Sequence, residues 1–290
     1  MIVHQGKTFA EVYEASLKSL FNTPQFETKP RDMHIRENTD VALVVEDPLS
    51  CLYSNPTRSS QFKYIAAEFL WYYMGRNDVA FIEKFAKFWN SIQNEDGTVN
   101  SSYGNLLFTR KNRYGLNQYE WAFKSLVNDK DSRQAIMHFN LPQHQYFGNK
   151  DFVCTMYGIF QIRDNKLNLT ISMRSNDAIW GTPTDVAFFC SLLSQMHLHL
   201  LSTGLMNDLQ LGTYTHIANS YHIYERHFST VENMLAGEFS PINLPKVDAN
   251  LISTDGVATT SLNLMFNNYS EKEPPIKSKI YEWLHQNINH

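Results

Sequence analysis

The stretch DFVCTMYGIFQIRDNKLNLTISMRS (residues 151–175) contains two segments rich in β-branched and aromatic residues, separated by the turn-forming tripeptide RDN. These two segments predict successive β-strands. A largely apolar segment at residues 184–201 follows and predicts a long buried helix. Because strands come one after another before a helix, without a steady βαβ alternation, the pattern predicts an α+β fold with one large mixed sheet covered by helices.

The rest of the chain shows no internal repeat and no low-complexity segment. Apolar residues at helical spacing predict further helices over residues 8–21, 61–75, 81–89, 116–127 and 220–237. Further strands are predicted over residues 39–48 and 134–139. Length and composition favour a single domain over residues 1–290, with a less regular C-terminal tail from about residue 237.

The composition excludes several classes of protein. Hydrophobic residues make up 43% of the chain and charged residues 19%, which is typical of a folded globular protein. The net charge of −4 argues against a general nucleic-acid-binding protein. The three widely spaced cysteines fit a reducing cytoplasm better than a disulfide framework or a zinc site. The sequence has no apparent signal peptide, no membrane-spanning apolar stretch, no metal motif and no nucleotide-binding glycine motif, so we expect a cytoplasmic protein without a metal.

Two residues are candidates for catalysis. Cys154 lies early in a predicted strand and is either a small buried hydrophobic residue or a nucleophile. As a nucleophile it needs an electropositive neighbour, which Arg174 provides if the two predicted strands pair. Glu68 lies inside a strongly apolar predicted helix. It is either on the solvent-exposed edge of that helix or an acid–base group with a raised pKa.

Other polar residues are candidates for binding. Arg174 and Ser175 are adjacent and can hold an anion. Arg133 precedes a predicted strand and is either a solvated side chain or a binding residue. His222 and Tyr224 are two residues apart, so they share a face only in an extended segment or at the start of a helix.

In their order and spacing, these residues resemble the thymidylate synthase family, most closely the bacteriophage deoxycytidylate hydroxymethylases. The resemblance runs from about residue 31 to residue 228, with the motifs EFLW (68–71), NDKDSR (128–133) and MRSND (173–177). The matched positions are Arg31, Glu68, Trp89, Tyr103, Arg133, Cys154, Arg174, Ser175, Asp177, His222 and Tyr224. If the chain is phage-encoded, its compartment is the host cytoplasm.

The resemblance implies transfer of a one-carbon unit from the co-substrate 5,10-methylenetetrahydrofolate to carbon-5 of a pyrimidine deoxynucleoside monophosphate. Cys154 matches the nucleophile that adds to carbon-6, and Glu68 the group that moves protons through ordered water. Trp89 and Asp177 match positions near the folate, although each is equally plausible as a structural residue.

The resemblance also implies how the nucleotide is held. The implied phosphate site comprises Arg31, Arg174, Ser175 and, across a homodimer interface at one sheet face, Arg133. His222 and Tyr224 match the pair that holds the sugar 3′-hydroxyl, and Tyr103 matches a further substrate contact.

Two departures from the synthases concern the phosphate and the nucleophile. Gln134 replaces a second phosphate-binding arginine. Thr155 follows the nucleophile where synthases have histidine, and the phage hydroxymethylases also have threonine there.

Asp185 lies where a synthase has the asparagine that contacts the uracil edge. A carboxylate accepts a hydrogen bond from the amino group of cytosine but repels the carbonyl oxygen of uracil. A proton between its second oxygen and the ring nitrogen, carried by either partner, would complete a bidentate pair. The implied substrate is therefore dCMP. The alternative is that Asp185 caps the following helix.

The C-terminal sequence bears on the product of the reaction, for which several alternatives exist. The polar C-terminal run HQNINH does not match the apolar tail that closes a synthase site, which favours addition of water and a 5-hydroxymethyl product. The alternatives on the same scaffold are a thymidylate synthase, a dUMP hydroxymethylase and a dCMP methyltransferase. Two alternatives belong to other functional classes. One is a hydrolase that uses Cys154 and His222, and the other is a nucleotide-binding protein without catalytic activity.

Overall fold

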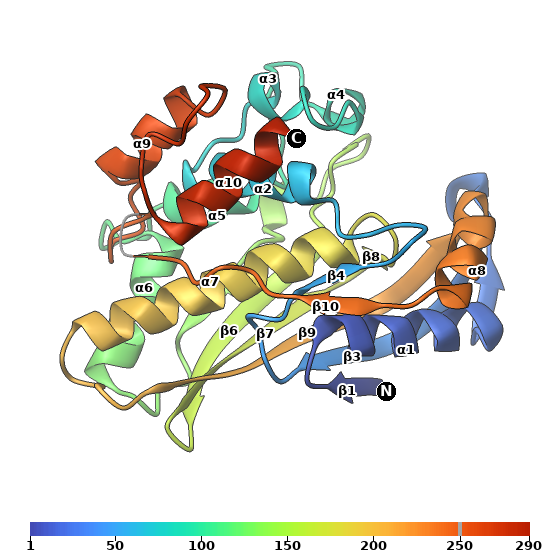
Figure 1. Cartoon of the computed structure of the whole chain (residues 1–290), viewed down its shortest axis with the longest axis horizontal. Coiled ribbons are helices and arrows are strands. Elements are labelled where there is room, and N and C mark those ends of the chain that lie inside the picture. Colours follow the sequence, from blue (N-terminus) through green and yellow to red (C-terminus); the bar gives the residue numbers. More distant parts are fainter. Residues whose placement is uncertain (249–250) are drawn as a thin grey trace. The chain divides into compact units, whose positions relative to one another are not determined.

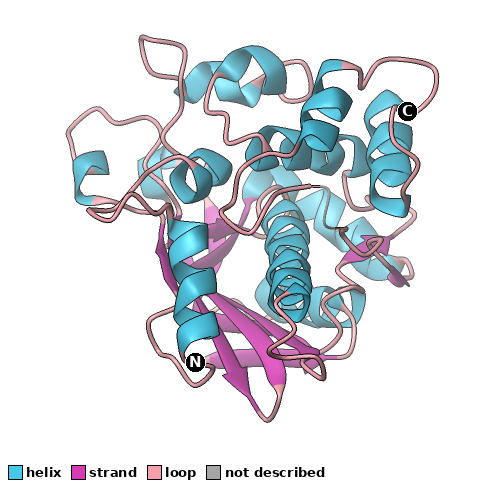
Figure 2. Cartoon of the chain, turned by 90° about the vertical axis from the view of Figure 1, so that its left-hand side faces the viewer, coloured by secondary structure: helices cyan, strands magenta, loops and turns pink. Residues whose placement is uncertain are grey.

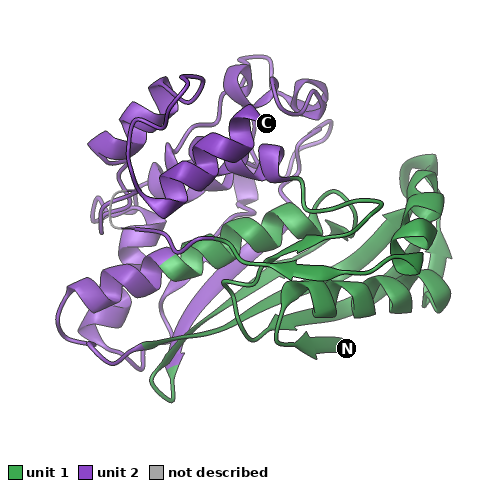
Figure 3. Cartoon of the chain, in the orientation of Figure 1, with its two compact units in different colours: residues 1–61, 163–194, 210–244 green, residues 62–162, 195–209, 245–290 purple. Residues whose placement is uncertain are grey.

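A computed structural model describes residues 1–248 and 251–290 of the chain. The chain forms two compact units, each assembled from three separate stretches (Figure 3). Unit 1 comprises residues 1–61, 163–194 and 210–244, and unit 2 comprises residues 62–162, 195–209 and 245–290. Figure 2 shows that the chain contains both helices and strands, as expected for an α+β protein.

Unit 1 is built on a mixed sheet (Figure 1). Strand β1 pairs in parallel with β3, β3 pairs antiparallel with β9, and β9 pairs in parallel with β7 and with β8, while β2 pairs antiparallel with β3. The bounds are β1 Ile2–Gly6, β2 Phe26–Thr28, β3 Ile35–Val45, β7 Lys166–Met173, β8 Asn176–Asp177 and β9 Gln210–Tyr224. A separate antiparallel pair joins β4 Leu52–Ser54 to β10 Ser240–Ile242. Strands distant in sequence thus lie side by side in this unit.

Helix α1 (Phe9–Asn22) covers part of this sheet and packs against helix α8 (Phe228–Ala236). Its start is fixed by a capping box, in which the Thr8 hydroxyl accepts from the backbone N–H of Glu11 and the Glu11 carboxylate accepts from the backbone of Thr8. The apolar face is buried, including Phe9, Val12, Tyr13 and Leu17. This is the amphipathic pattern that predicted the helix.

Unit 2 is mainly helical. Its helices are α2 Phe62–Tyr73, α3 Val79–Ile82, α4 Phe88–Ile92, α5 Tyr103–Phe108, α6 Gln118–Asn128, α9 Thr260–Asn267 and α10 Lys279–Asn289. The antiparallel strands β5 (Ile136–His138) and β6 (Thr155–Arg163) belong largely to the same unit. Helix α7 (Thr182–Ser202) is one continuous helix whose first residues belong to unit 1 and whose last residues belong to unit 2.

Helices α2 and α5 approach each other very closely at Gly104. A Cβ atom at this position would lie 1.8 Å from the backbone oxygen of Tyr72, where no atom can be placed. Glycine is therefore required, because only a residue without a side chain lets the two backbones meet. The contact places the start of α5 beside the end of α2.

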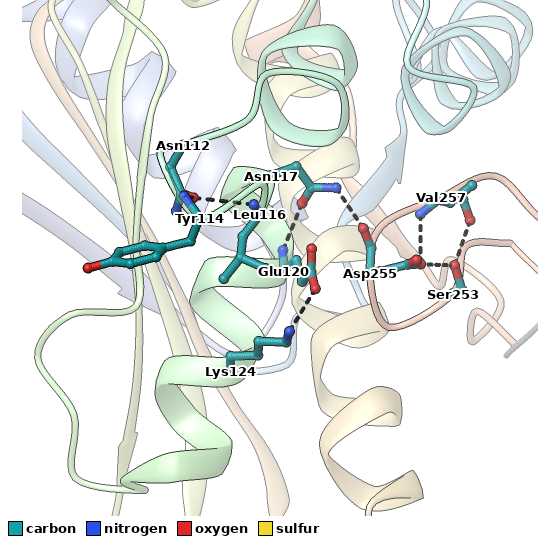
Figure 4. A network of polar contacts seen from close by, with 9 residues as sticks. All are labelled: Asn112, Tyr114, Leu116, Asn117, Glu120, Lys124, Ser253, Asp255 and Val257. Atoms are coloured by element: carbon teal, nitrogen blue, oxygen red, sulfur yellow. Dashed lines mark hydrogen bonds and ion pairs between the residues drawn. The ribbon is translucent and has the colours of Figure 1, made fainter.

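Asn117 connects three segments of unit 2 (Figure 4). Its Oδ1 accepts from the backbone N–H of Glu120 at 2.8 Å and so caps helix α6. Its Nδ2 donates to the backbone oxygens of Phe108 at 3.1 Å and of Asp255 at 2.6 Å. One buried side chain thus anchors the C-terminal stretch to α5 and α6.

Several sequence predictions need correction. The helix expected over residues 81–89 is wrong, because two short helices, α3 and α4, leave most of that range non-helical. The helix expected over residues 220–237 is wrong in its first part, since β9 continues to Tyr224 through its pairing with β3. Cys154 lies just before strand β6, not within it. The tail after residue 237, expected to be less regular, contains β10, α9 and α10.

The remaining elements expected from the sequence are confirmed within a few residues of their predicted ends. They are α1, α2, α6, α7, β3, β5, β6 and β7.

Candidate active site

Glu68 is buried in helix α2, with 5% of its surface exposed. Its Oε1 accepts hydrogen bonds from the hydroxyl groups of Tyr64 at 2.8 Å and Tyr72 at 3.1 Å. The three residues follow one another at a spacing of four, so they lie on one face of the helix. The solvent-exposed alternative for Glu68 is therefore wrong.

Trp89 and Tyr103 both connect to the surroundings of Glu68. The indole N–H of Trp89 donates to Tyr64 Oη at 3.0 Å, and because an indole can only donate, the Tyr64 hydroxyl hydrogen is directed at Glu68. The ring of Tyr103 stacks on Tyr72 at a centroid distance of 5.3 Å. Unit 2 thus brings together three of the residues predicted from the sequence.

Cys154 is partly exposed in the loop before β6. The loop is held at Val153, whose backbone oxygen accepts from Asn140 Nδ2 at 2.7 Å. It is held again at Asp151, whose Oδ2 accepts from the backbone N–H groups of residues 100 and 101 at 2.6 and 2.8 Å. Those residues directly precede Tyr103, so the Cys154 loop and the start of α5 are tied together.

Thr155 and Arg133 are two further residues of unit 2 that the sequence singled out. The hydroxyl of Thr155 is fully buried next to Cys154, and within residues 1–248 and 251–290 no group hydrogen-bonds to it. Arg133 is exposed in the bend before β5, and Gln134, which follows it, is exposed as well. Arg133 is thus not gathered with Glu68 by any contact that the described residues show, and its side chain is open to another molecule.

In unit 1, the segment between β7 and α7, which includes β8, carries Arg174, Ser175 and Asp177, all partly exposed. Asp177 Oδ1 accepts from the backbone N–H groups of Ile179 at 2.8 Å and Trp180 at 3.2 Å. One oxygen of this carboxylate thus stabilises the turn before α7. The same segment is also anchored by helix α1, because the Tyr13 hydroxyl donates to the backbone oxygen of residue 178 at 2.7 Å.

Asp185 is buried in the first turn of α7, with 9% of its surface exposed. Its Oδ2 accepts from Asn176 Nδ2 at 2.8 Å. Its backbone N–H already donates to Gly181 O at 2.9 Å, as in the interior of a helix. Because α7 begins at Thr182, Asp185 lies within the helix and not at its cap. The capping alternative is therefore wrong in its geometry.

His222 and Tyr224 lie at the end of β9, with ring centroids 5.0 Å apart. Their spacing on a strand places both on one face, as the extended-segment prediction required. His222 is buried, which lowers its pKa, while the nearby Asp177 carboxylate raises it and the Arg31 guanidinium lowers it. Arg31 itself is exposed in a turn with φ 52°, in the left-handed region. Unit 1 thus brings Arg31, Asp177 and the His222–Tyr224 pair together.

Four contributors were not anticipated from the sequence. Tyr64 and Tyr72 orient Glu68, and their spacing of four around it is a signal that the sequence did contain. Asn176 contacts Asp185, and His216 contacts Asn176, through hydrogen bonds between separate strands and a helix that no local pattern reveals.

A further cluster lies beside Tyr224. The Arg226 guanidinium lies 4.3 Å from the centroid of the Tyr224 ring and 5.1 Å from that of the half-exposed Trp180. Arg226 therefore covers one face of Tyr224 by cation–π contact.

Residues 46–281 match the family model described as thymidylate synthase. The chain belongs to the thymidylate synthase family. It is 30% identical over 179 residues to the deoxycytidylate 5-hydroxymethyltransferase of Enterobacteria phage T4. The aligned region covers 59% of this chain and 70% of that protein. It is 28% identical over 204 residues to the deoxyuridylate hydroxymethyltransferase of Bacillus phage SP01, with 67% of this chain and 52% of that protein covered.

A thymidylate synthase is similar as well, in sequence and in fold. The thymidylate synthase of Clostridium beijerinckii is 27% identical over 220 residues, covering 75% of this chain and 78% of that protein. The solved structure of thermostable thymidylate synthase A from Bacillus subtilis superposes with a TM-score of 0.65 at 21% identity, over 81% of this chain and 86% of that one. The α+β thymidylate synthase fold is thereby confirmed.

This member of the thymidylate synthase family is therefore a one-carbon transferase with hydroxymethylase and synthase relatives. No helix in residues 1–248 and 251–290 is long and apolar enough to cross a membrane. Over the same two ranges, no group of three or more His, Cys, Asp or Glu side chains is arranged to hold a metal ion.

Proposed function

We propose that this protein transfers a one-carbon unit from 5,10-methylenetetrahydrofolate to carbon-5 of dCMP and releases 5-hydroxymethyl-dCMP. The observation that carries the proposal is the buried carboxylate of Asp185, with one oxygen engaged by the amide of Asn176 at 2.8 Å. A buried acceptor at this position suits the amino group of cytosine and repels the carbonyl oxygen of uracil. The similarity to the phage T4 enzyme supports the same substrate.

In this proposal the Cys154 thiolate adds to carbon-6 of the pyrimidine, which makes carbon-5 nucleophilic. The thiol lies in a loop held at Val153 and Asp151, so its position is fixed without being sealed from solvent. Carbon-5 then forms a bond to the one-carbon unit and loses its proton. Glu68, with its Oε1 held by two tyrosine hydroxyls, moves protons between ordered water and the ring.

The nucleotide is positioned by charge and by hydrogen bonds. Arg31, Arg174 and Ser175 of one subunit, with Arg133 contributed across a homodimer interface, hold the phosphate in this proposal. Burial lowers the pKa of His222, so its imidazole is neutral at neutral pH and can accept or donate toward the 3′-hydroxyl. Trp89 and Asp177 contact the folate.

A hydroxymethyl product requires that water reach the exocyclic methylene left on carbon-5. The buried hydroxyl of Thr155, without a hydrogen-bond partner among the residues described, supports this step, since it can orient a water molecule next to Cys154. The alternative is a dUMP-specific synthase or hydroxymethylase, which the similarity to the SP01 and Clostridium proteins favours.

The proposal is tested by tritium release from carbon-5 of labelled dCMP and labelled dUMP, each with methylenetetrahydrofolate, and by mass spectrometry of the products. We expect release from dCMP and a product in which a hydroxymethyl group replaces the hydrogen on carbon-5. The Cys154→Ala variant should bind dCMP but release no tritium, which separates catalysis from binding. Release from dUMP alone would refute the assignment of dCMP, and release without folate would favour a different reaction.

A further inference from the structure

A chain of buried polar side chains leads through unit 1 to Asp185. The hydroxyl of Tyr214 lies 2.8 Å from His216 Nδ1. His216 Nε2 lies 3.1 Å from Asn176 Oδ1, and Asn176 Nδ2 lies 2.8 Å from Asp185 Oδ2. All four side chains are at most 9% exposed. The chain connects strand β9 to β8 and then to helix α7.

The hydrogen positions along this chain follow from its chemistry. Asn176 donates with its amino group, so the amide oxygen faces the other way and accepts from Thr182 Oγ1 and from His216. His216 must therefore carry its hydrogen on Nε2, and its bare Nδ1 accepts from the Tyr214 hydroxyl. Burial lowers the pKa of His216 to about 3, so the ring keeps this single hydrogen near neutral pH.

The space around the amide and the carboxylate is tight. A Cβ atom on Gly181 would lie 3.0 Å from Asn176 Nδ2 and 3.4 Å from Asp185 Oδ2. Such an atom would crowd both polar groups, so glycine at position 181 leaves the room that the amide–carboxylate pair occupies. A buried hydrogen-bonded network of this kind restricts the orientation of its members.

We propose that Asn176 and His216 are positioning residues for base selection: they hold Asp185 Oδ2 as an acceptor and so fix the carboxylate edge that reads cytosine. This inference rests on the proposed function. His216 fixes the orientation of the Asn176 amide, and the amide fixes the carboxylate. Without this support the carboxylate can turn, and the edge offered to the base is no longer defined.

The first test measures binding of dCMP and of dUMP to the full-length chain by isothermal titration calorimetry. Asn176→Ala should weaken dCMP binding at least tenfold and leave dUMP binding within threefold. The matched control is Asn219→Ala, because Asn219 Nδ2 donates to Asp40 Oδ1 at the same distance of 2.8 Å in an exposed pair. Asn219→Ala should leave both affinities unchanged.

The second test needs no variant. Nitrogen NMR of the wild-type protein should show His216 protonated on Nε2, and addition of dCMP should shift the side-chain amide signal of Asn176 more than addition of dUMP does. A hydrogen on Nδ1, or equal shifts with both nucleotides, would overturn the inference even if Asn176→Ala does not fold.

The outcomes distinguish the two proposals. If the wild-type protein selects dCMP and Asn176→Ala keeps the same selectivity, the positioning role is refuted while the proposed function stands. If the wild-type protein binds neither nucleotide or prefers dUMP, the proposed function fails, and the positioning role fails with it.

Discussion

Replacing Asp185 with asparagine should reverse the base preference. The side chain of Asn176 donates to Asp185 Oδ2 at 2.8 Å, so the new amide must place its carbonyl oxygen there. Its amino group is then forced to the opposite edge. There it meets the amino group of cytosine, donor against donor, but can donate to the carbonyl oxygen of uracil.

The size of the effect follows from these two contacts. An unmatched buried polar group costs about 1–3 kcal/mol, and a new neutral hydrogen bond contributes about 1 kcal/mol. Together they change the dCMP-to-dUMP preference by about 2–4 kcal/mol, or roughly 30- to 700-fold.

The assay compares kcat/KM for the two nucleotides by tritium release, with circular dichroism to confirm folding. Asp40→Asn is the control, because Asp40 is an exposed aspartate that also accepts from an asparagine at 2.8 Å. A ratio within threefold of wild type in Asp185→Asn would refute the base-reading role.

Three further predictions concern stability, measured by urea unfolding. The pKa of His216 is about 3 in the folded protein against 6.5 when exposed, so its contribution to the free energy of unfolding is complete above pH 6.5 and decreases by about 5 kcal/mol as the pH falls to 3. His216→Gln should therefore make the free energy of unfolding less dependent on pH in this range. An unchanged pH dependence in the variant would contradict the lowered pKa. Asn117→Ala should lower the free energy of unfolding by about 2–3 kcal/mol, since it removes a helix cap and leaves the Asp255 carbonyl without its donor. A loss below about 0.5 kcal/mol would be inconsistent with Asn117 as an anchor of the C-terminal stretch. Gly104→Ala should lower the free energy of unfolding by about 3 kcal/mol or more, because the new methyl group clashes with the Tyr72 backbone. A variant as stable as the wild type would show that α2 and α5 can separate.

The local sequence determined most of the secondary structure and many of the candidate residues. Helical spacing of apolar residues gave α1, α2, α6 and α7, because each buries one face or all of its surface. The order and spacing of the motifs indicated the thymidylate synthase family, which the family match confirms. The buried state of Glu68 could also have been anticipated from the two tyrosines spaced four residues on either side.

Only the tertiary structure decided the state of residues whose partners are distant in sequence. Residues 220–224 have a helical pattern by themselves but form a strand, because pairing with β3 outweighs a weak local preference. The sequence left helix capping open as an alternative role for Asp185, and the start of α7 at Thr182 excludes it. Its partner Asn176 and the buried His216 are joined to it by contacts across β8, β9 and α7. Such contacts depend on how the strands pair and the helix packs, and these are properties of the whole fold that a local pattern does not contain.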